Sequence, residues 1–189
     1  MAESGLGSLR ATHAVKVEWR AFELRSNGAQ PVPAEYRERI RQGWPRAQQI
    51  ARERFNLEMN RPEEVGEPGM TFLAHVGAKY ALEHGQGEAY HHAVFRAHWQ
   101  ELRDIGDVNV LAEIANGLGL DEAAFRAALE DPLRRSAVME DEEWAYRHGL
   151  GGVPAFIFGN RYLVSGAQPA AQLREVAERC VAEGLTMDE

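Results

Sequence analysis

The sequence has only one cysteine, Cys180, among its 189 residues. A single thiol forms neither an internal disulfide nor a Cys-x-x-Cys motif, which excludes a small secreted domain held together by disulfides. The N-terminus carries no apolar run of secretory length, and no stretch approaches the 18 apolar residues that indicate a membrane-spanning helix. We therefore expect a soluble, cytoplasmic protein.

Positive charge is also scarce, because 21 Lys and Arg residues stand against 29 Asp and Glu residues, a formal net charge of -8. A chain this acidic has no overall attraction for nucleic acid or an anionic membrane. Basic clusters such as Arg37, Arg39 and Arg41 alternate with acidic neighbours and indicate a solvated helix face. We expect neither a nucleic acid nor a membrane as partner.

The sequence lacks recognisable metal-binding and nucleophile motifs as well. His91 and His92 are adjacent, so they point roughly 100° apart on a helix, and no cysteine or carboxylate completes a zinc pattern. The acidic run Glu140–Glu143 indicates solvated helix charge. No P-loop, nucleophile elbow or dinucleotide fingerprint is present, so we expect no metal site and no catalytic residue of these kinds.

Among the patterns that are present, alternation of apolar and polar residues over 15–22 predicts a β-strand. From Ala34 to about Met59 the apolar period becomes helical, and Pro45 predicts a kink or a junction of two helices. After a loop over 61–69, five further helical segments follow. They are 72–83 with Thr71 as N-cap or early helix residue, 88–103, the helix capped by Asp107, the helix capped by Asp121, and the helix from Pro132 to His148.

Two short apolar runs follow the helical stretch. Val153–Phe158 and Tyr162–Val164 flank Gly159–Asn160, and this two-residue turn signal predicts a β-hairpin. Pro154 has no N–H to donate inside a sheet, so it fits the first residue of a strand. A last helix is predicted beyond residue 169, with Cys180 as a buried structural thiol on its apolar face.

Three stretches resemble the FrnE-like branch of the DsbA family of thioredoxin-fold proteins. They are VEWRAFEL at 17–24, RDIGD at 103–107 followed by VLA at 110–112, and GVPAFIF at 152–158 with VSGAQP at 164–169. The last is the most specific, because Val-Pro-x-Phe, a hairpin and then Gly-Ala-Gln near a helix start occur together in the family. With Thr71-Phe72 and His75, the resemblance spans most of the chain from Val15 to Arg179.

The resemblance implies an α/β chain in which a thioredoxin-like fold carries a large all-helical insertion domain. It implies a discontinuous thioredoxin-like domain, 1–32 with 149–189, and an inserted helical domain, 33–148. In the family, a loop ending in a cis-proline binds the backbone of extended substrates, which assigns that loop to Gly152, Val153 and Pro154. His75 matches a family segment and is a candidate ligand contact, although packing alone also accounts for a histidine there.

The family's Cys-x-x-Cys motif, which follows the first strand of the fold, has no counterpart in this sequence. Residues 1–4 resemble the interior of the first helix, so the first strand and both cysteines would precede Met1. An internal start of the chain explains this arrangement, and so does natural loss of the segment. Without that strand its neighbours lose a hydrogen-bonding partner, so we expect a homodimer through sheet edges.

Three functions stay open at this point. The first is the family's thiol-disulfide oxidoreductase or isomerase activity, of which this chain would be a truncated or redox-inactive form. The second is a redox-dead module that binds an extended peptide or a protein thiol substrate. The third is glutathione-dependent isomerase or transferase chemistry of the kind found in 2-hydroxychromene-2-carboxylate isomerase and kappa-class glutathione transferases. Glutathione would be the cofactor only in the third case.

Overall fold

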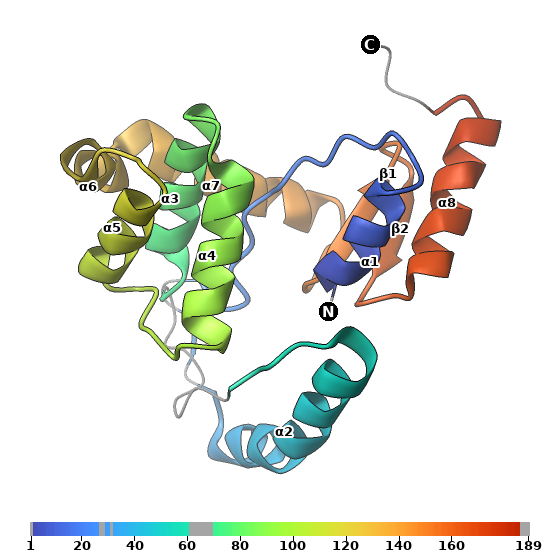
Figure 1. The fold of residues 1–189 in the computed structure, drawn as a ribbon, viewed down its shortest axis with the longest axis horizontal. Helices are drawn as coiled ribbons and strands as arrows, with labels where there is room; N and C mark the ends of the chain where they lie inside the picture. Colours follow the sequence, from blue (N-terminus) through green and yellow to red (C-terminus); the bar gives the residue numbers. More distant parts are fainter. Residues whose placement is uncertain (1, 27–28, 31, 61–69, 186–189) are drawn as a thin grey trace. The chain divides into compact units, whose positions relative to one another are not determined.

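A computed structural model describes residues 2–26, 29–30, 32–60 and 70–185 (Figure 1). The elements of this described part are α1 (Ala2–Arg10), α2 (Ala34–Phe55), α3 (Phe72–Glu83), α4 (Gly87–Trp99), α5 (Val108–Gly117), α6 (Glu122–Glu130), α7 (Pro132–Arg147), β1 (Ala155–Phe158), β2 (Tyr162–Ser165) and α8 (Ala170–Ala182). The loop expected over 61–69 lies outside the described residues. None of the described helices is both long and apolar enough to span a bilayer.

The chain divides into two compact units. The hairpin unit runs to Trp19 and resumes at Tyr146, and the helical unit runs from Arg20 to Ala145. The segment after Trp19 groups with the helical unit because the backbone N–H groups of Ala21 and Glu23 donate to carboxylates of α7. The domain boundaries expected from the sequence, 1–32 with 149–189 and 33–148, stay a prediction.

The hairpin unit is built on the predicted β-hairpin, which is confirmed. β1 and β2 pair antiparallel, with Ala155 opposite Ser165 and Phe158 opposite Tyr162. The turn requires positive φ at Gly159 (53°) and Asn160 (54°), which glycine and asparagine adopt more readily than other residues. One face of the hairpin then packs against α1 and α8 through a small apolar cluster. Its buried members are Leu9, Val164, Leu173 and Ala177.

The helical unit has a larger apolar core. α3 packs against α4, α5 and α6, so its apolar residues lie at the centre of this core. The largest fully buried side chains of the unit are Val76, Tyr90, Leu111, Phe125, Leu129 and Val138. Burial at about 25 cal/mol per Å² of apolar surface is the main stabilising contribution here, as in most domains.

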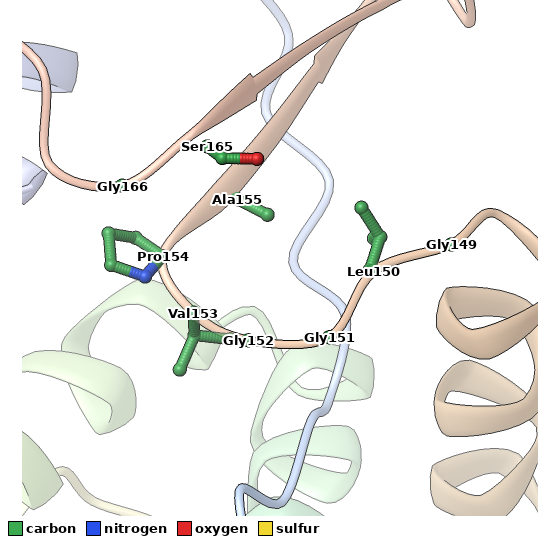
Figure 2. A pocket seen from close by; sticks show the side chains of 9 residues that line it. All are labelled: Gly149, Leu150, Gly151, Gly152, Val153, Pro154, Ala155, Ser165 and Gly166. Atoms are coloured by element: carbon green, nitrogen blue, oxygen red, sulfur yellow. The ribbon is translucent and has the colours of Figure 1, made fainter.

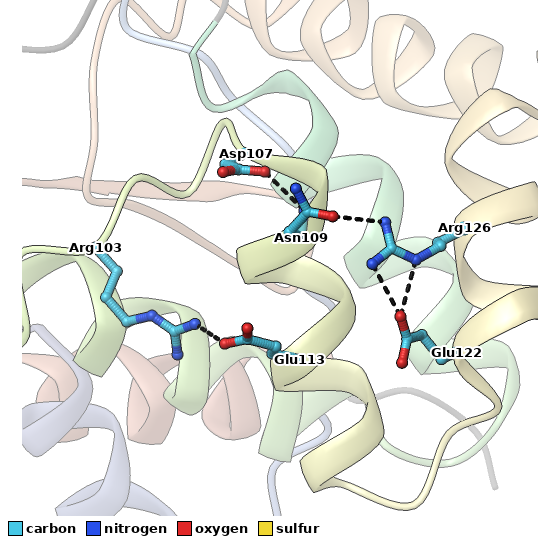
Figure 3. A network of polar contacts seen from close by, with 6 residues as sticks. All are labelled: Arg103, Asp107, Asn109, Glu113, Glu122 and Arg126. Atoms are coloured by element: carbon cyan, nitrogen blue, oxygen red, sulfur yellow. Dashed lines mark hydrogen bonds and ion pairs between the residues drawn. The ribbon is translucent and has the colours of Figure 1, made fainter.

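N-terminal caps and surface polar contacts stabilise α5 and α6, and Figure 3 shows part of this network. Asp107 accepts a hydrogen bond from the Asn109 N–H (2.8 Å), and Asp121 accepts one from the Ala124 N–H (2.7 Å), so both predicted caps are confirmed. Arg126 donates to Glu122 on its own helix and to the Asn109 side chain, which ties α6 to the start of α5. Arg103 pairs with Glu113 in the same region.

The strand expected over 15–22 was wrong. The segment 15–22 forms no strand, because no other described segment pairs with its backbone. Its side chains still alternate, with Val15 and Val17 half-buried and Lys16 and Glu18 exposed. At Pro45, α2 is continuous from Ala34 to Phe55 with the proline inside it, so the segment is not divided into two helices. The kink expected at Pro45 stays a prediction.

Candidate functional site

The loop that joins α7 to β1 borders an open hollow (Figure 2). The hollow measures about 360 Å³, and residues 149–155, Ser165 and Gly166 line it. Gly152, Val153 and Pro154, the loop residues singled out in the sequence, all lie in this lining. None of the lining side chains carries a charge. The surface of the hollow consists mainly of backbone atoms and of small or apolar side chains.

Pro154 marks the point where the hairpin ladder stops. The Gly166 N–H donates to the Pro154 carbonyl (2.8 Å), one position beyond the Ala155–Ser165 pair. Residues Pro154 and Gly166 therefore form a pair with only one hydrogen bond, because proline has no N–H to donate back to the Gly166 carbonyl. The Val153–Pro154 peptide bond is cis in the structure. The ladder therefore ends at the rim of the hollow, and Val153 is the first residue outside it.

Backbone groups at this rim are open to a ligand. Because the Pro154 carbonyl faces β2, antiparallel geometry turns the N–H and C=O of Ala155 to the opposite edge of β1. Within the part of the chain that the structure describes, the Val153 N–H and C=O make no backbone hydrogen bond. The Val153 side chain is 50% exposed. An extended chain laid along this edge would find unpaired donors and acceptors at strand spacing.

His75, the other candidate from the sequence, lies in the helical unit. Burial lowers the pKa of its imidazole to about 4, while a hydrogen bond with the Phe22 backbone and the charge of Asp141 oppose that shift. The ring is therefore neutral near pH 7 and takes part in the packing of its own unit. Its role as a ligand contact stays a prediction.

The sequence analysis missed a buried charged cluster on α7. Asp141 is 5% exposed and accepts hydrogen bonds from the Ala21 N–H (2.8 Å) and Lys79 Nζ (2.5 Å). Arg20 completes the cluster, with Nη1 3.3 Å from the same carboxylate and its guanidinium over the Trp144 ring. The cluster holds the segment after Trp19 against α3 and α7.

The expectation of solvated charge over Glu140–Glu143 is therefore wrong for Asp141. A signal in the sequence was available. Asp141 is three residues after Val138 and four before Ala145, and both of these are buried. This spacing places Asp141 on the buried face of α7, while Glu140 and Glu143 point to solvent. A carboxylate on such a face needs donors, which Lys79 and Ala21 supply.

Glu23 is a second buried carboxyl in the same segment, at 2% exposure. Its Oε1 accepts from the Thr71 hydroxyl (2.8 Å), so Thr71 precedes α3 as expected but uses its side chain for this contact and not for capping. Burial raises the pKa of Glu23, and the nearby Glu142 acts in the same direction. The segment 20–23 is thus anchored by side chains in place of a strand partner.

Cys180 lies on the buried face of α8 at 6% exposure. Burial raises the pKa of its thiol, and Glu183 adds to the effect. A thiol in such surroundings is a poor nucleophile. Among the described residues, no group of three or more histidine, cysteine or acidic side chains is arranged to hold a metal ion.

Comparison with known proteins agrees with this architecture. A family model described as the DSBA-like thioredoxin domain matches residues 1–177. The uncharacterized protein YwbO of Bacillus subtilis (strain 168) is 31% identical over 170 residues, which are 89% of this chain and 82% of that protein.

Solved structures give the same result. A probable DsbA oxidoreductase from Streptomyces coelicolor is 31% identical, with a TM-score of 0.81 over 98% of this chain and 85% of that one. A 2-hydroxychromene-2-carboxylate isomerase is 18% identical and shares the fold, with a TM-score of 0.76 over 98% and 92% of the two chains. The predicted α/β thioredoxin-like fold with its helical insertion is confirmed, and the chain belongs to the DSBA-like thioredoxin domain family.

Proposed function

We propose that this chain is a FrnE-like member of its family that binds an extended polypeptide at the loop Gly152–Pro154. The observation that carries the proposal is the open backbone at the end of the hairpin ladder, where Val153 borders an uncharged hollow. A bound segment would add to β1 as a further strand. Its backbone would supply most of the affinity, and the small lining residues would favour small or apolar side chains next to the loop.

In this proposal the residues of this sequence bind the polypeptide without exchanging disulfides with it. Exchange needs an attacking thiolate and, for release of the mixed disulfide, a second thiol. The sequence offers one cysteine, whose thiol is buried and has a raised pKa. Oxidoreductase or isomerase activity of the kind named for its relatives therefore requires thiols from another source.

Two glycine substitutions test the binding loop. A Cβ placed at Gly151 or Gly152 meets no atom within 4 Å, and neither residue has a left-handed φ, so the backbone at both positions accepts a side chain. Because both glycines line the hollow, a leucine at either position adds bulk at the proposed binding surface. Gly7→Leu, at an exposed position of α1 with equally open space, is the matched control.

The probe is a fluorescein-labelled peptide of alternating valine and threonine, read by fluorescence anisotropy. Gly151→Leu and Gly152→Leu should each weaken binding at least about tenfold, or about 1.4 kcal/mol, and Gly7→Leu should leave it unchanged. A peptide N-methylated at alternate residues loses the N–H donors on one of its edges. The wild-type protein should bind this peptide as weakly as the leucine variants bind the unmodified one. Equal affinity for both peptides would refute backbone pairing at this loop.

Glutathione is a second candidate ligand, because it is itself an extended tripeptide and the hollow lies at the lower end of the size range of small-molecule sites. Titration calorimetry with reduced glutathione tests this directly. Saturable binding that Gly152→Leu removes would assign the loop to glutathione. Heat no different from buffer dilution at millimolar concentration would leave polypeptide binding as the function of the loop.

A further inference from the structure

The β-hairpin has two faces, and its pairing register assigns each side chain to one of them. Phe156 and Phe158 belong to the face that packs on the apolar cluster with α1 and α8. Because side chains alternate along a strand and directly opposite residues share a face, the remaining residues of the ladder lie on the second face. This second face, called the outer face below, consists of Ala155, Ile157, Leu163 and Ser165. Figure 2 shows the Ala155 and Ser165 side chains projecting to the same side.

The same register determines which backbone groups of β1 are available to a ligand. Pro154 accepts its hydrogen bond from Gly166, and hydrogen-bonded pairs alternate with non-hydrogen-bonded pairs along an antiparallel ladder. The N–H and C=O groups of Ala155 and Ile157 therefore point away from β2. Within the described part of the chain, no backbone group bonds to them at that edge. A strand that adds to β1 therefore pairs with Ala155 and Ile157.

This pairing determines what the side chains of an added strand contact. Residues that pair with Ala155 and Ile157 lie on the outer face, because directly opposite residues share a face. There Ile157 is half-buried and its neighbour Leu163 is 48% exposed. The residues in between lie beside Phe156 and Phe158, which are only half-buried although they pack against the cluster. Both faces of the added strand therefore contact accessible apolar surface.

Neither face offers a charged group to a polar side chain. β1 and β2 contain no charged residue, and the lining of the neighbouring hollow contains none either. Ser165, at the end next to the hollow, is the one polar member of the outer face. A hydroxyl or charged side chain opposite Ile157 would lose water without gaining a hydrogen-bond partner, which is unfavourable. An alternating apolar and polar segment fits one face only, whereas a run of consecutive apolar residues fits both.

We infer that this edge selects an uncharged segment of consecutive apolar residues, and that Ile157 and Leu163 determine the selection on the outer face. The inference rests on the proposed function, because it concerns the polypeptide that adds to β1. β1 is four residues long, so a run of about five residues covers it. The backbone hydrogen bonds are the same for every bound sequence, and the side-chain contacts on the two faces provide the discrimination.

Three fluorescein-labelled peptides test the inference by fluorescence anisotropy. Their central segments of about five residues are all valine, all threonine, or valine and threonine in alternation, and their flanking residues are identical. Valine and threonine have similar shapes and both favour strands, so the peptides differ mainly in how many methyl groups are replaced by hydroxyls. The test variant is Leu163→Thr. Leu24→Thr, the same substitution at a residue that is 67% exposed, is the matched control.

The all-valine peptide should bind at least about tenfold more tightly than the alternating peptide, because the latter turns a row of hydroxyls toward one apolar face. The all-threonine peptide should bind more weakly still. Leu163→Thr should reduce the ratio between the first two peptides to about threefold or less, since the outer face then tolerates hydroxyls. Leu24→Thr should leave the ratio unchanged. Unchanged far-ultraviolet circular dichroism spectra verify that both variants fold.

Equal affinity for the three peptides overturns the inference and leaves the proposed binding of polypeptides in place. Tightest binding of the alternating peptide also overturns it, because one face of the bound strand is then in water. An unchanged ratio in Leu163→Thr overturns the role of the outer face. Failure of all three peptides to bind refutes the proposed function itself. Binding of the all-valine peptide that weakens as the protein concentration is raised overturns the inference and assigns the edge to a second copy of the chain.

Discussion

The buried carboxylate of Asp141 offers a quantitative test of the helical unit. It accepts from the Ala21 N–H and from Lys79, and its pair with Arg20 joins the segment after Trp19 to α7. Removing one partner of a buried ion pair costs about 3–5 kcal/mol when the other charge stays buried. Here the side chains of Lys79 and Arg20 are 22% and 38% exposed, so water recovers part of that cost.

We therefore expect Asp141→Asn to reduce the free energy of unfolding by about 2 kcal/mol, because the charge is lost while an acceptor for the Ala21 N–H remains. Asp141→Ala should cost about 3 kcal/mol, since it also leaves that buried N–H without an acceptor. Glu140→Ala, at the exposed neighbour, is the control and should stay within about 0.5 kcal/mol of the wild type.

Urea unfolding followed by circular dichroism measures these differences, and amide hydrogen exchange gives an independent reading. The Ala21 amide should lose protection in Asp141→Ala and keep most of it in Asp141→Asn. Lys79→Met combined with Asp141→Leu should cost at least about 1 kcal/mol less than the two single changes together, because neither charge is then left alone. An Asp141→Asn variant as stable as the Glu140→Ala control would refute the buried ion-pair cluster.

Four further predictions concern other parts of the chain. Because the pKa of His75 is lowered to about 4 in the folded protein, its contribution to stability is complete above the ordinary pKa of about 6.5 and declines as the pH falls toward 4. Between pH 7 and 4.5 this loss is about 2 kcal/mol, and urea unfolding of His75→Gln should show a correspondingly flatter pH dependence. Gly77→Ala should destabilise the core by about 2 kcal/mol, because its Cβ would lie 2.3 Å from the Tyr90 hydroxyl and 2.7 Å from Phe125 Cζ. Tyr90→Phe removes only the first of these clashes, so the double variant should recover only part of the loss. The thiol of Cys180 should react with Ellman's reagent in urea but at least about a thousandfold more slowly in the native protein, and an equal rate in both conditions would contradict its burial. A homodimer through sheet edges should appear by light scattering at tens of micromolar, and a monomeric mass at that concentration would reject it.

Local signals in the sequence predicted those elements whose physical cause is local. The segment 72–83 is helical over the residues its period indicated, and the caps at Asp107 and Asp121 were recognised because a cap bonds to a backbone N–H two or three residues away. The hairpin was recognised for the same reason, since Gly159–Asn160 supplies the positive φ values that join its strands.

The strand expected over 15–22 failed because a strand requires a partner that the alternating pattern does not specify. Its alternation is present in the structure as alternating burial, with Val15 and Val17 turned inward. Among the residues that the structure describes, no second backbone pairs with it. Ala21 and Glu23 donate instead to Asp141 and Glu142, which lie about 120 residues later in the chain.

The same dependence on distant partners limited the prediction of the site. Val-Pro at the head of an apolar run predicted where the hairpin ladder ends, because proline terminates a ladder by its own chemistry. The assignment of Gly152–Pro154 as a binding loop came from the family resemblance and stays a prediction. Whether the backbone beyond Pro154 is open depends on which other segment approaches it, and Asp141 became buried through the donors that happen to reach it. A tripeptide fixes where a ladder ends, but the full chain decides what is free to bind there. The backbone N–H and C=O groups of Val153 and Ala155 that are open to a ligand, more than the sequence motif, therefore support polypeptide binding at this loop.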